Sequence, residues 1–89
     1  MILFDEAKRQ SNLAKHGLDL VDAHLVYNSP NKITLQSPRN DEHRLMDVAL
    51  VEAMGIVLVL VYVERGDDIR AISLRRASRQ ERIRYADYQ

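Results

Sequence analysis

Basic side chains crowd the last part of this 89-residue chain, where every positive residue is an arginine. A planar guanidinium holds two phosphate oxygens through parallel hydrogen bonds, which a point-like ammonium cannot do. The cluster therefore indicates contact with a phosphate-bearing ligand, although a basic C-terminal helix can also simply be solvated. The arginines of residues 65–89 are Arg65, Arg70, Arg75, Arg76, Arg79, Arg82 and Arg84.

The distribution of charge supports the same interpretation. The formal net charge is zero, but residues 1–64 hold six Lys or Arg against nine Asp or Glu. Residues 65–89 reverse this balance, with seven basic side chains against four acidic ones. Opposite signs in two parts of one chain are typical of a site for a polyanion or a charged partner.

Cleavage of RNA without a metal ion needs three groups: a base for the 2′-hydroxyl proton, cations for the charged phosphorane, and an acid for the leaving oxygen. Arg70 and Arg75 are the candidates for the cationic role, because both fall on a predicted strand beside an apolar core. The base stays open among Glu81, His16 and Lys8.

Tyr85 follows Glu81 by one helical turn, so its ring could stack on a nucleobase or its hydroxyl could act as the acid. Each of these residues also has a purely structural interpretation. Glu81 fits a helix cap, Tyr85 fits a core position, and His16 fits a helix end.

A polar stripe in the first part of the chain offers further contacts. Lys8, Asn12, Lys15 and His16 are spaced so that they share one face of a helix. This face is either solvated or a row of phosphate and base contacts. Together with Arg65, Arg76 and Arg79, the first three of these residues form the predicted RNA-binding set.

Cofactor chemistry is not expected. The chain lacks cysteine, a Gly-rich phosphate loop and an H-E-x-x-H motif. His16, His24 and His43 do not have the spacing of metal ligands. We therefore expect no metal and no other cofactor.

The strand that organises the predicted fold is residues 56–64, an almost uninterrupted apolar run rich in β-branched side chains. It is too short to cross a bilayer, which needs about 20 apolar residues. Nothing at the N-terminus resembles a secretory signal, so a cytoplasmic protein is expected. Hairpins connect this strand to the predicted strands 43–52 and 69–75, and a polar loop is expected over residues 37–42.

Helices are predicted before and after the strands in the chain, packed on the sheet. One begins after Asp5 and ends at Gly17. The face expected to approach the sheet is small apart from its ends and consists of Phe4, Ala7, Ser11, Ala14 and Leu18. A second runs from the cap Asp19 to about residue 27, and a short edge strand follows between two prolines.

The last helix begins at a capping box formed by Ser78 and Glu81, with Ile83 as its main apolar anchor. On the strand before it, regular alternation would place Arg70, Ile72 and Leu74 on one side and Ser73 and Arg75 on the other. The predicted fold is a single α+β domain over residues 1–89: two N-terminal helices, a four-stranded antiparallel meander sheet and a C-terminal helix.

Two stretches of the chain resemble the BrnT toxins. The first is residues 4–8 with Asn12 and residues 15–17, and the second is residues 64–77 with Glu81 and Tyr85. The order and separation of the two stretches match the family's pattern, and together they span nearly the whole chain. Leu74 stands where the family has a small residue, and it would narrow the cleft if it faced it.

The resemblance implies a type II toxin with a RelE-like fold and metal-independent ribonuclease activity that blocks translation. It also implies a BrnA-type antitoxin with a ribbon-helix-helix domain, through which alone the complex would reach operator DNA. No membrane partner is expected. The alternative is a non-catalytic module that binds RNA or protein, such as a degenerated toxin acting as a co-repressor.

Overall fold

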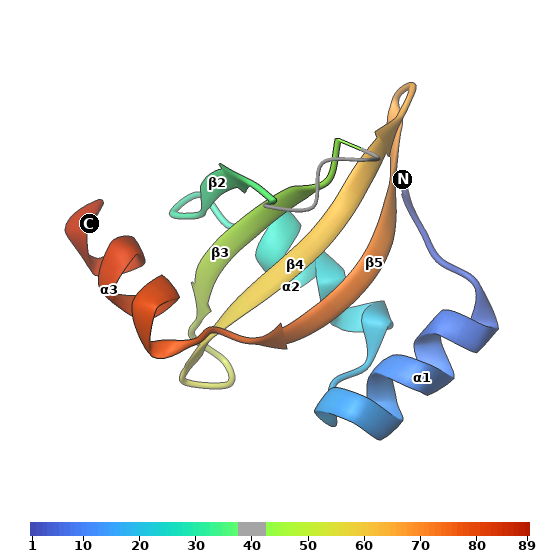
Figure 1. Ribbon diagram of the computed structural model, residues 1–89, viewed down its shortest axis with the longest axis horizontal. Coiled ribbons are helices and arrows are strands. Elements are labelled where there is room, and N and C mark those ends of the chain that lie inside the picture. Colours follow the sequence, from blue (N-terminus) through green and yellow to red (C-terminus); the bar gives the residue numbers. More distant parts are fainter. Residues whose placement is uncertain (38–42) are drawn as a thin grey trace.

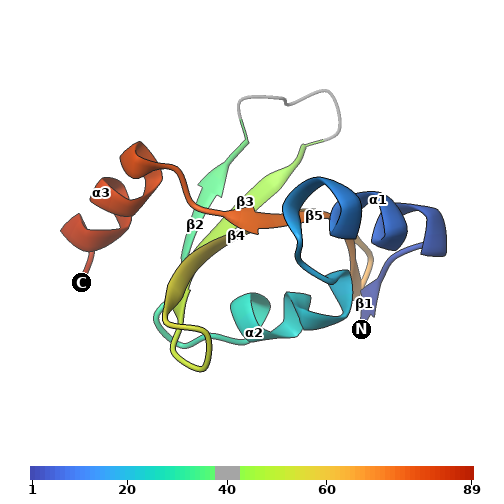
Figure 2. The ribbon, with the colours of Figure 1, turned by 90° about the horizontal axis from the view of Figure 1, so that it is seen from below.

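The computed structural model describes residues 1–37 and 43–89, which form one sheet with helices packed around it. Figure 1 shows α1 and α3 at opposite ends of the molecule, and Figure 2 shows α2 on one side of the sheet. The α+β class is confirmed, whereas most of the predicted loop at 37–42 lies outside the described residues. In chain order the elements are β1 (Ile2–Leu3), α1 (Glu6–His16), η1 (Leu20–Ala23), α2 (His24–Tyr27), β2 (Ile33–Gln36), β3 (Leu45–Val51), β4 (Ile56–Arg65), β5 (Asp68–Arg76) and α3 (Arg79–Asp87).

The sheet has the strand order β1-β5-β4-β3-β2. Strands β2 to β5 form the predicted antiparallel meander. Strand β4 is the central strand of the whole sheet. The prediction of four strands was wrong, because β1 adds a fifth strand that pairs parallel to β5 through Ile2 and Leu3. Two residues are too few to show a strand period, so this pairing could not be recognised before β5 was in place.

Local signals set the ends of α1 and α3 as expected. The Asp5 carboxylate accepts from the Lys8 amide at 2.7 Å, and Gly17 closes α1 with a φ of 69°. Ser78 and Glu81 form the predicted capping box of α3. Each cap satisfies backbone groups that a helix end otherwise leaves unpaired.

The predicted second helix is divided. Asp19 caps it, but residues 20–23 form the 3₁₀ helix η1 and only His24–Tyr27 continue as the α-helix α2. The tighter first part places Leu20, Ala23 and Val26 against the sheet, and all three are fully buried. The prediction of one continuous α-helix here was therefore wrong.

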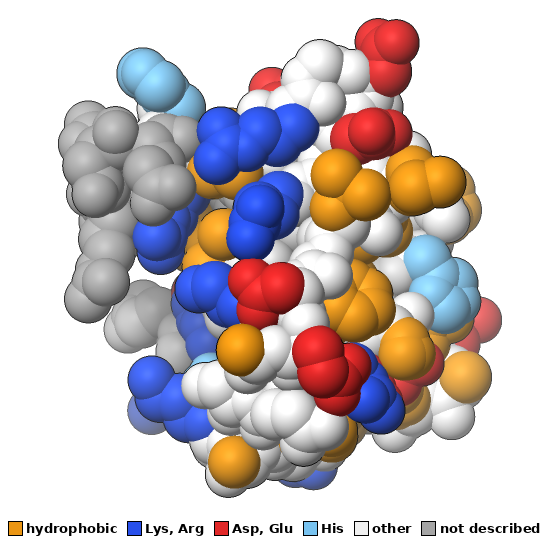
Figure 3. All heavy atoms as spheres, turned by 90° about the vertical axis from the view of Figure 1, so that its right-hand side faces the viewer, with side chains coloured by type: hydrophobic (Ala, Val, Ile, Leu, Met, Phe, Trp, Pro, Cys, Tyr) orange, Lys and Arg blue, Asp and Glu red, His pale blue; other side chains and the backbone are white. Residues whose placement is uncertain are grey.

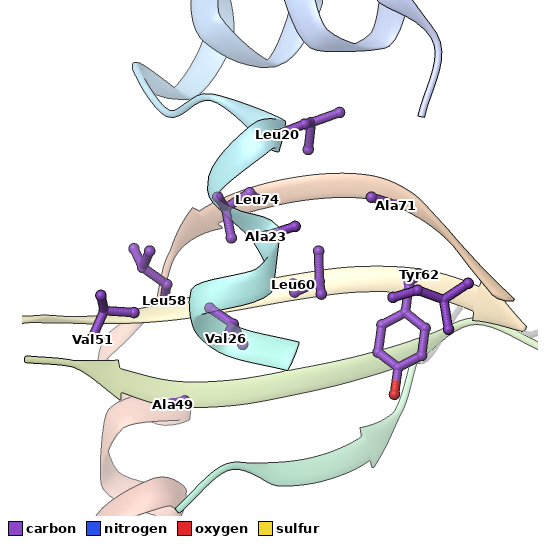
Figure 4. Packing of buried hydrophobic residues seen from close by; sticks show 11 residues of the cluster. Leu20, Ala23, Val26, Ala49, Val51, Leu58, Leu60, Tyr62, Ala71 and Leu74 are labelled. Carbon is purple, nitrogen blue, oxygen red and sulfur yellow. The ribbon is translucent and has the colours of Figure 1, made fainter. Parts of the chain in front are cut away.

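The main core lies between η1–α2 and one face of the sheet (Figure 4). Leu58, Leu60 and Leu74 are fully buried there. Leu74 therefore points away from the opposite face and narrows nothing on it. A second, smaller cluster on that opposite face joins α3 to the sheet; its buried members are Met46, Val48, Val59, Ala77 and Tyr85.

A β-bulge in β5 decides which residues face which side. Val61 pairs with Ser73 and the next residue, Tyr62, pairs with Ala71, so Ile72 is an extra residue in the ladder. Since paired residues share a face, Arg70, Ser73 and Arg75 all lie on the side of the small cluster. The predicted regular alternation along this strand was wrong.

Helix α1 is attached to the edge of β5 through an amide. Asn12 Nδ2 donates to the carbonyls of Leu18 and Leu74 at 2.8 and 2.9 Å, and Asn12 Oδ1 accepts from the Leu74 amide at 3.0 Å. Asn12 is the buried residue of α1, whereas Ala7, Ser11 and Ala14 are exposed. Phe4 and Leu18, at the two ends of the predicted face, do pack against the main core, but the prediction was wrong for the three small residues between them.

The main anchor of α3 is Tyr85 rather than Ile83, which confirms the interpretation of Tyr85 as a core residue. Tyr85 is 6% exposed and packs in the small cluster, while Ile83 is 45% exposed. Tyr85 is the one buried residue of α3. A stacking or acid role for Tyr85 conflicts with this placement, since its ring is occupied by core packing.

A buried carboxylate connects three strands on the side of the main core. Asp47 on β3 is fully buried. It accepts hydrogen bonds from Lys32 Nζ and Thr34 Oγ1, both at 2.7 Å, and from the Tyr62 hydroxyl at 3.0 Å. Burial, followed by the charge of Asp47, raises the pKa of Tyr62. The buried negative charge of Asp47 is thus paired with Lys32, and its oxygens accept hydrogen bonds from side chains of the fold.

Candidate functional site

A cleft of about 460 Å³ lies on the face of the sheet opposite the main core. Its floor includes apolar side chains of three strands, Met46, Val61 and Ile72, and one of its walls is α1. The described lining residues are Lys8, Ser11, Asn12, Lys15, His16, Ser37, Arg44, Met46, Val61, Ile72, Ser73 and Arg75.

The charged groups of this lining are all basic. Lys8 and Lys15 come from α1, Arg44 precedes β3, and Arg75 comes from β5. None of the described lining residues is acidic. Figure 3, which looks at the molecule from the side of α1, shows Lys and Arg side chains gathered toward the left of the view and hydrophobic ones toward the right. The lining therefore suits an anionic ligand.

His16 lies in the cleft at the end of α1. Burial lowers the pKa of its imidazole, and the charges of Lys15 and Arg75 lower it further. The neutral ring is thereby favoured near neutral pH, and a neutral imidazole has a lone pair that can accept a proton.

Arg75 forms a bidentate ion pair with Glu81. Its Nη1 and Nη2 donate to the two carboxylate oxygens at 2.7 and 2.8 Å. This hydrogen bonding lowers the pKa of Glu81 to about 2 and raises that of Arg75. A carboxylate with so low a pKa is a weak base, so the geometry disfavours Glu81 as a proton acceptor.

The structure brings together only part of the predicted site. Five of the predicted residues line the cleft: Lys8, Asn12, Lys15, His16 and Arg75. Glu81 reaches it indirectly through Arg75. Tyr85 is buried below α3, and the remaining arginines are not among the described lining residues: Arg65, Arg70, Arg76 and Arg79.

Arg70 shares a face of β5 with Arg75 but has a different partner. Its Nη2 donates to Asp5 Oδ2 at 3.1 Å, at the start of α1. Of the two arginines predicted to bind phosphate, Arg75 lines the cleft, whereas Arg70 is paired with Asp5 and is not among the described lining residues.

Sequence reasoning missed Arg44, Ser11, Ser37 and Ser73, which also line the cleft. Arg44 stood in a predicted strand without a pattern to distinguish it. Ser73 shares a face of β5 with Arg75, as regular alternation predicts, but a single serine on a strand gives no signal for a site. Ser11 was predicted to pack on the sheet, so its place in the cleft wall follows from the corrected orientation of α1.

Two negative findings apply to the described residues. No group of three or more His, Cys, Asp or Glu side chains is arranged to hold a metal ion. No helix there is both long and apolar enough to cross a membrane.

Fold and cleft define a small α+β domain with a basic, partly apolar cleft whose lining suits an anionic ligand. The comparison with known families is consistent with this class. Residues 4–81 match the family described as "Ribonuclease toxin, BrnT, of type II toxin-antitoxin system", and the chain belongs to this family. The family is one of ribonuclease toxins that have an antitoxin partner. No curated protein matches the chain.

Proposed function

We propose that this protein binds RNA in the basic cleft and cleaves it there without a metal ion. The observation that carries the proposal is the convergence of Lys8, Lys15, His16 and Arg75 from two distant parts of the chain on one cleft. A phosphodiester in it meets cations from α1 on one side and from β5 on the other.

In the proposed reaction, neutral His16 accepts the proton of the 2′-hydroxyl as O2′ attacks phosphorus. The new O2′–P bond forms as the P–O5′ bond breaks. Arg75 stabilises the charge of the phosphorane, and the leaving O5′ takes a proton from an ammonium group of the cleft, Lys8 or Lys15. The products are a 2′,3′-cyclic phosphate and a free 5′-hydroxyl.

The donor set supports chemistry without a metal. Hard divalent cations bind carboxylate oxygens, whereas the described lining residues offer cationic, hydroxyl and amide groups and the imidazole of His16, but no carboxylate. A second cation would be repelled by Lys8, Lys15 and Arg75 unless a ligand phosphate came first.

We further propose that the partner is an antitoxin of the BrnA type with a ribbon-helix-helix domain, and that operator DNA is reached through it. The proposed action is inhibition of translation in the cytoplasm, where the RNA is. The family's type II description and the resemblance in sequence support this assignment. An adjacent reading frame with a ribbon-helix-helix pattern, whose product co-purifies with this protein, would bear it out.

The central experiment incubates the purified protein with an RNA oligonucleotide in excess chelator. We expect fragments with cyclic phosphate ends, and a rate about 10²–10⁴ lower for His16→Ala, as for loss of a general base. Arg75→Ala should also be slow. Intact RNA in a salt-sensitive complex would instead identify a non-catalytic binding module.

Arg70→Ala is the matched control for Arg75→Ala. Both remove an arginine from the same face of β5, but Arg70 is paired with Asp5 and does not line the cleft. Equal losses in the two variants would show that basic charge on β5, rather than the cleft, carries the activity.

A further inference from the structure

We propose that Glu81 occupies the place of an RNA phosphate on Arg75, and that RNA takes this place by displacing the first turn of α3. The inference rests on the proposed function of the cleft and assigns a regulatory, non-catalytic part to Glu81. It also specifies the ligand: a chain of phosphodiesters, rather than a single phosphate.

The first argument is the geometry of the ion pair. Arg75 uses Nη1 and Nη2 together to hold the two oxygens of Glu81, at 2.7 and 2.8 Å. These are the donors with which a guanidinium grips two oxygens of a phosphate. In the RNA-free protein Arg75, one of the arginines that line the cleft, is thus already bound to an anion.

The second argument is that Glu81 cannot leave Arg75 by a simple rotation of its side chain. Its Oε1 also accepts from the Ser78 amide at 2.8 Å, as part of the capping box of α3. The carboxylate is therefore fixed to the helix, and separating it from Arg75 without loss of the cap requires the first turn of α3 to shift.

The third argument is the weak attachment of α3 to the rest of the protein. Tyr85 is the only buried residue in the helix. Ile83 is 45% exposed, and Tyr88, just after the helix, is 67% exposed. Few apolar contacts oppose a displacement of the helix, and elements with few buried contacts are the ones that open at low cost.

The fourth argument concerns what can displace the carboxylate. Glu81 is six residues from Arg75 in the same chain, so it competes at the high effective concentration of an intramolecular ligand. A single phosphate would have to displace Glu81 through its contact with Arg75 alone. An RNA strand also engages Lys8 and Lys15, which form no ion pair with any described residue, so its phosphates act together.

The test compares binding of an uncleavable 2′-deoxy oligonucleotide, followed by fluorescence anisotropy, for wild type, Glu81→Gln and Asp87→Asn. Glutamine keeps an oxygen that can accept from the Ser78 amide, but it removes the negative charge that pairs with Arg75. We expect Glu81→Gln to bind about tenfold more tightly, as for release of a charge-assisted hydrogen bond.

Asp87→Asn is the control for net charge, because it removes one negative charge from the other end of α3 (Arg79–Asp87). Equal gains in affinity for the two variants, or no gain for Glu81→Gln, would overturn the displacement of Glu81 and leave the RNA site intact. Absence of binding in all three proteins would overturn the RNA site itself and the displacement with it.

Hydrogen exchange provides a second readout on the wild-type protein. On binding the same oligonucleotide, amides of α3 should exchange faster while those of α1 become protected. Stronger protection of α3 in the complex would refute the displacement, since the helix would then stay in place. Inorganic phosphate at equal phosphorus concentration should leave α3 unchanged, and an equal effect would refute the need for a strand.

Discussion

The side-chain amide of Asn12 makes hydrogen bonds to the backbone of β5 that a neighbouring strand would otherwise make. The substitution Asn12→Ala tests whether this amide holds α1, a wall of the cleft, in place. Beyond the pairs that β1 makes with Ile69 and Arg70, the outer edge of β5 has Asn12 as partner for both backbone groups of Leu74. The substitution leaves these groups without a partner in a buried environment. We expect α1 to lose its fixed position on β5.

The magnitude follows from the two backbone groups of Leu74 that lose their partner. An unsatisfied buried donor or acceptor costs about 1–3 kcal/mol, so the loss of partners for both groups should lower the free energy of unfolding by about 2–6 kcal/mol. That is a large part of the roughly 5–15 kcal/mol of a natural domain. With a urea dependence of about 1–1.5 kcal/mol per molar, even the lower end of this loss should reduce the unfolding midpoint by about 1.3–2 M.

Urea denaturation followed by circular dichroism measures this change, and amide exchange at Leu74 localises it. Ser11→Ala is the matched control, because Ser11 precedes Asn12 on α1 and its side chain is exposed; its effect should stay within about 0.5 kcal/mol. A loss below about 1 kcal/mol for Asn12→Ala, together with weaker RNA binding, would refute the structural role and favour the RNA contact predicted from sequence.

Three further predictions concern titrating groups. Because the pKa of His16 is lowered in the folded protein, stability should decrease as pH falls through about 6.5, where the unfolded chain takes up the proton first; His16→Gln should flatten this part of the stability profile. Glu81 has a folded pKa of about 2, so its contribution is complete above its ordinary pKa of 4.5 and is lost as pH falls toward 2; an identical acid limb for wild type and Glu81→Gln, measured by urea denaturation, would contradict the pairing with Arg75. Asp47→Ala should cost about 3–5 kcal/mol, because Lys32 then loses its buried partner, whereas Thr34→Val removes one hydrogen bond and should cost far less; similar thermal melts for the two variants would show that the network is not a unit.

Features that depend on neighbouring residues in the chain could be predicted from the sequence. Asp5, Gly17 and the pair Ser78 and Glu81 set helix ends through contacts three or four residues away, which the sequence displays directly. The meander of β2 to β5 was equally accessible, since short turns connect apolar runs. Lys8 and His16 line the same cleft because their spacing on one helix gives them a common face, which the sequence predicts.

Features that depend on a partner strand could not be predicted. Ile72 can be recognised as an extra residue only when β5 is paired with β4. Regular alternation therefore assigned Ser73 and Arg75 correctly to one face, but it placed Arg70 on the other face. The face of α1 was misjudged because a polar residue, Asn12, is the buried one, against the usual rule. Ile83 was preferred to Tyr85 on hydrophobicity alone, although the direction in which α3 leaves β5 decides which side chain reaches the sheet.

The bulge at Ile72 also determines which residue of β5 could be deleted without disturbing its pairing with β4. If Ile72 were deleted, the pairs of β4 with residues 68–71 and with residues 73–76 could both persist in one regular ladder, and each guanidinium would keep its side of the sheet. Deletion of a different residue of β5 would put the two halves of the strand out of phase. A variant without Ile72 would therefore lose one apolar side chain from the floor of the cleft, but Arg75 would still face the cleft rather than the main core.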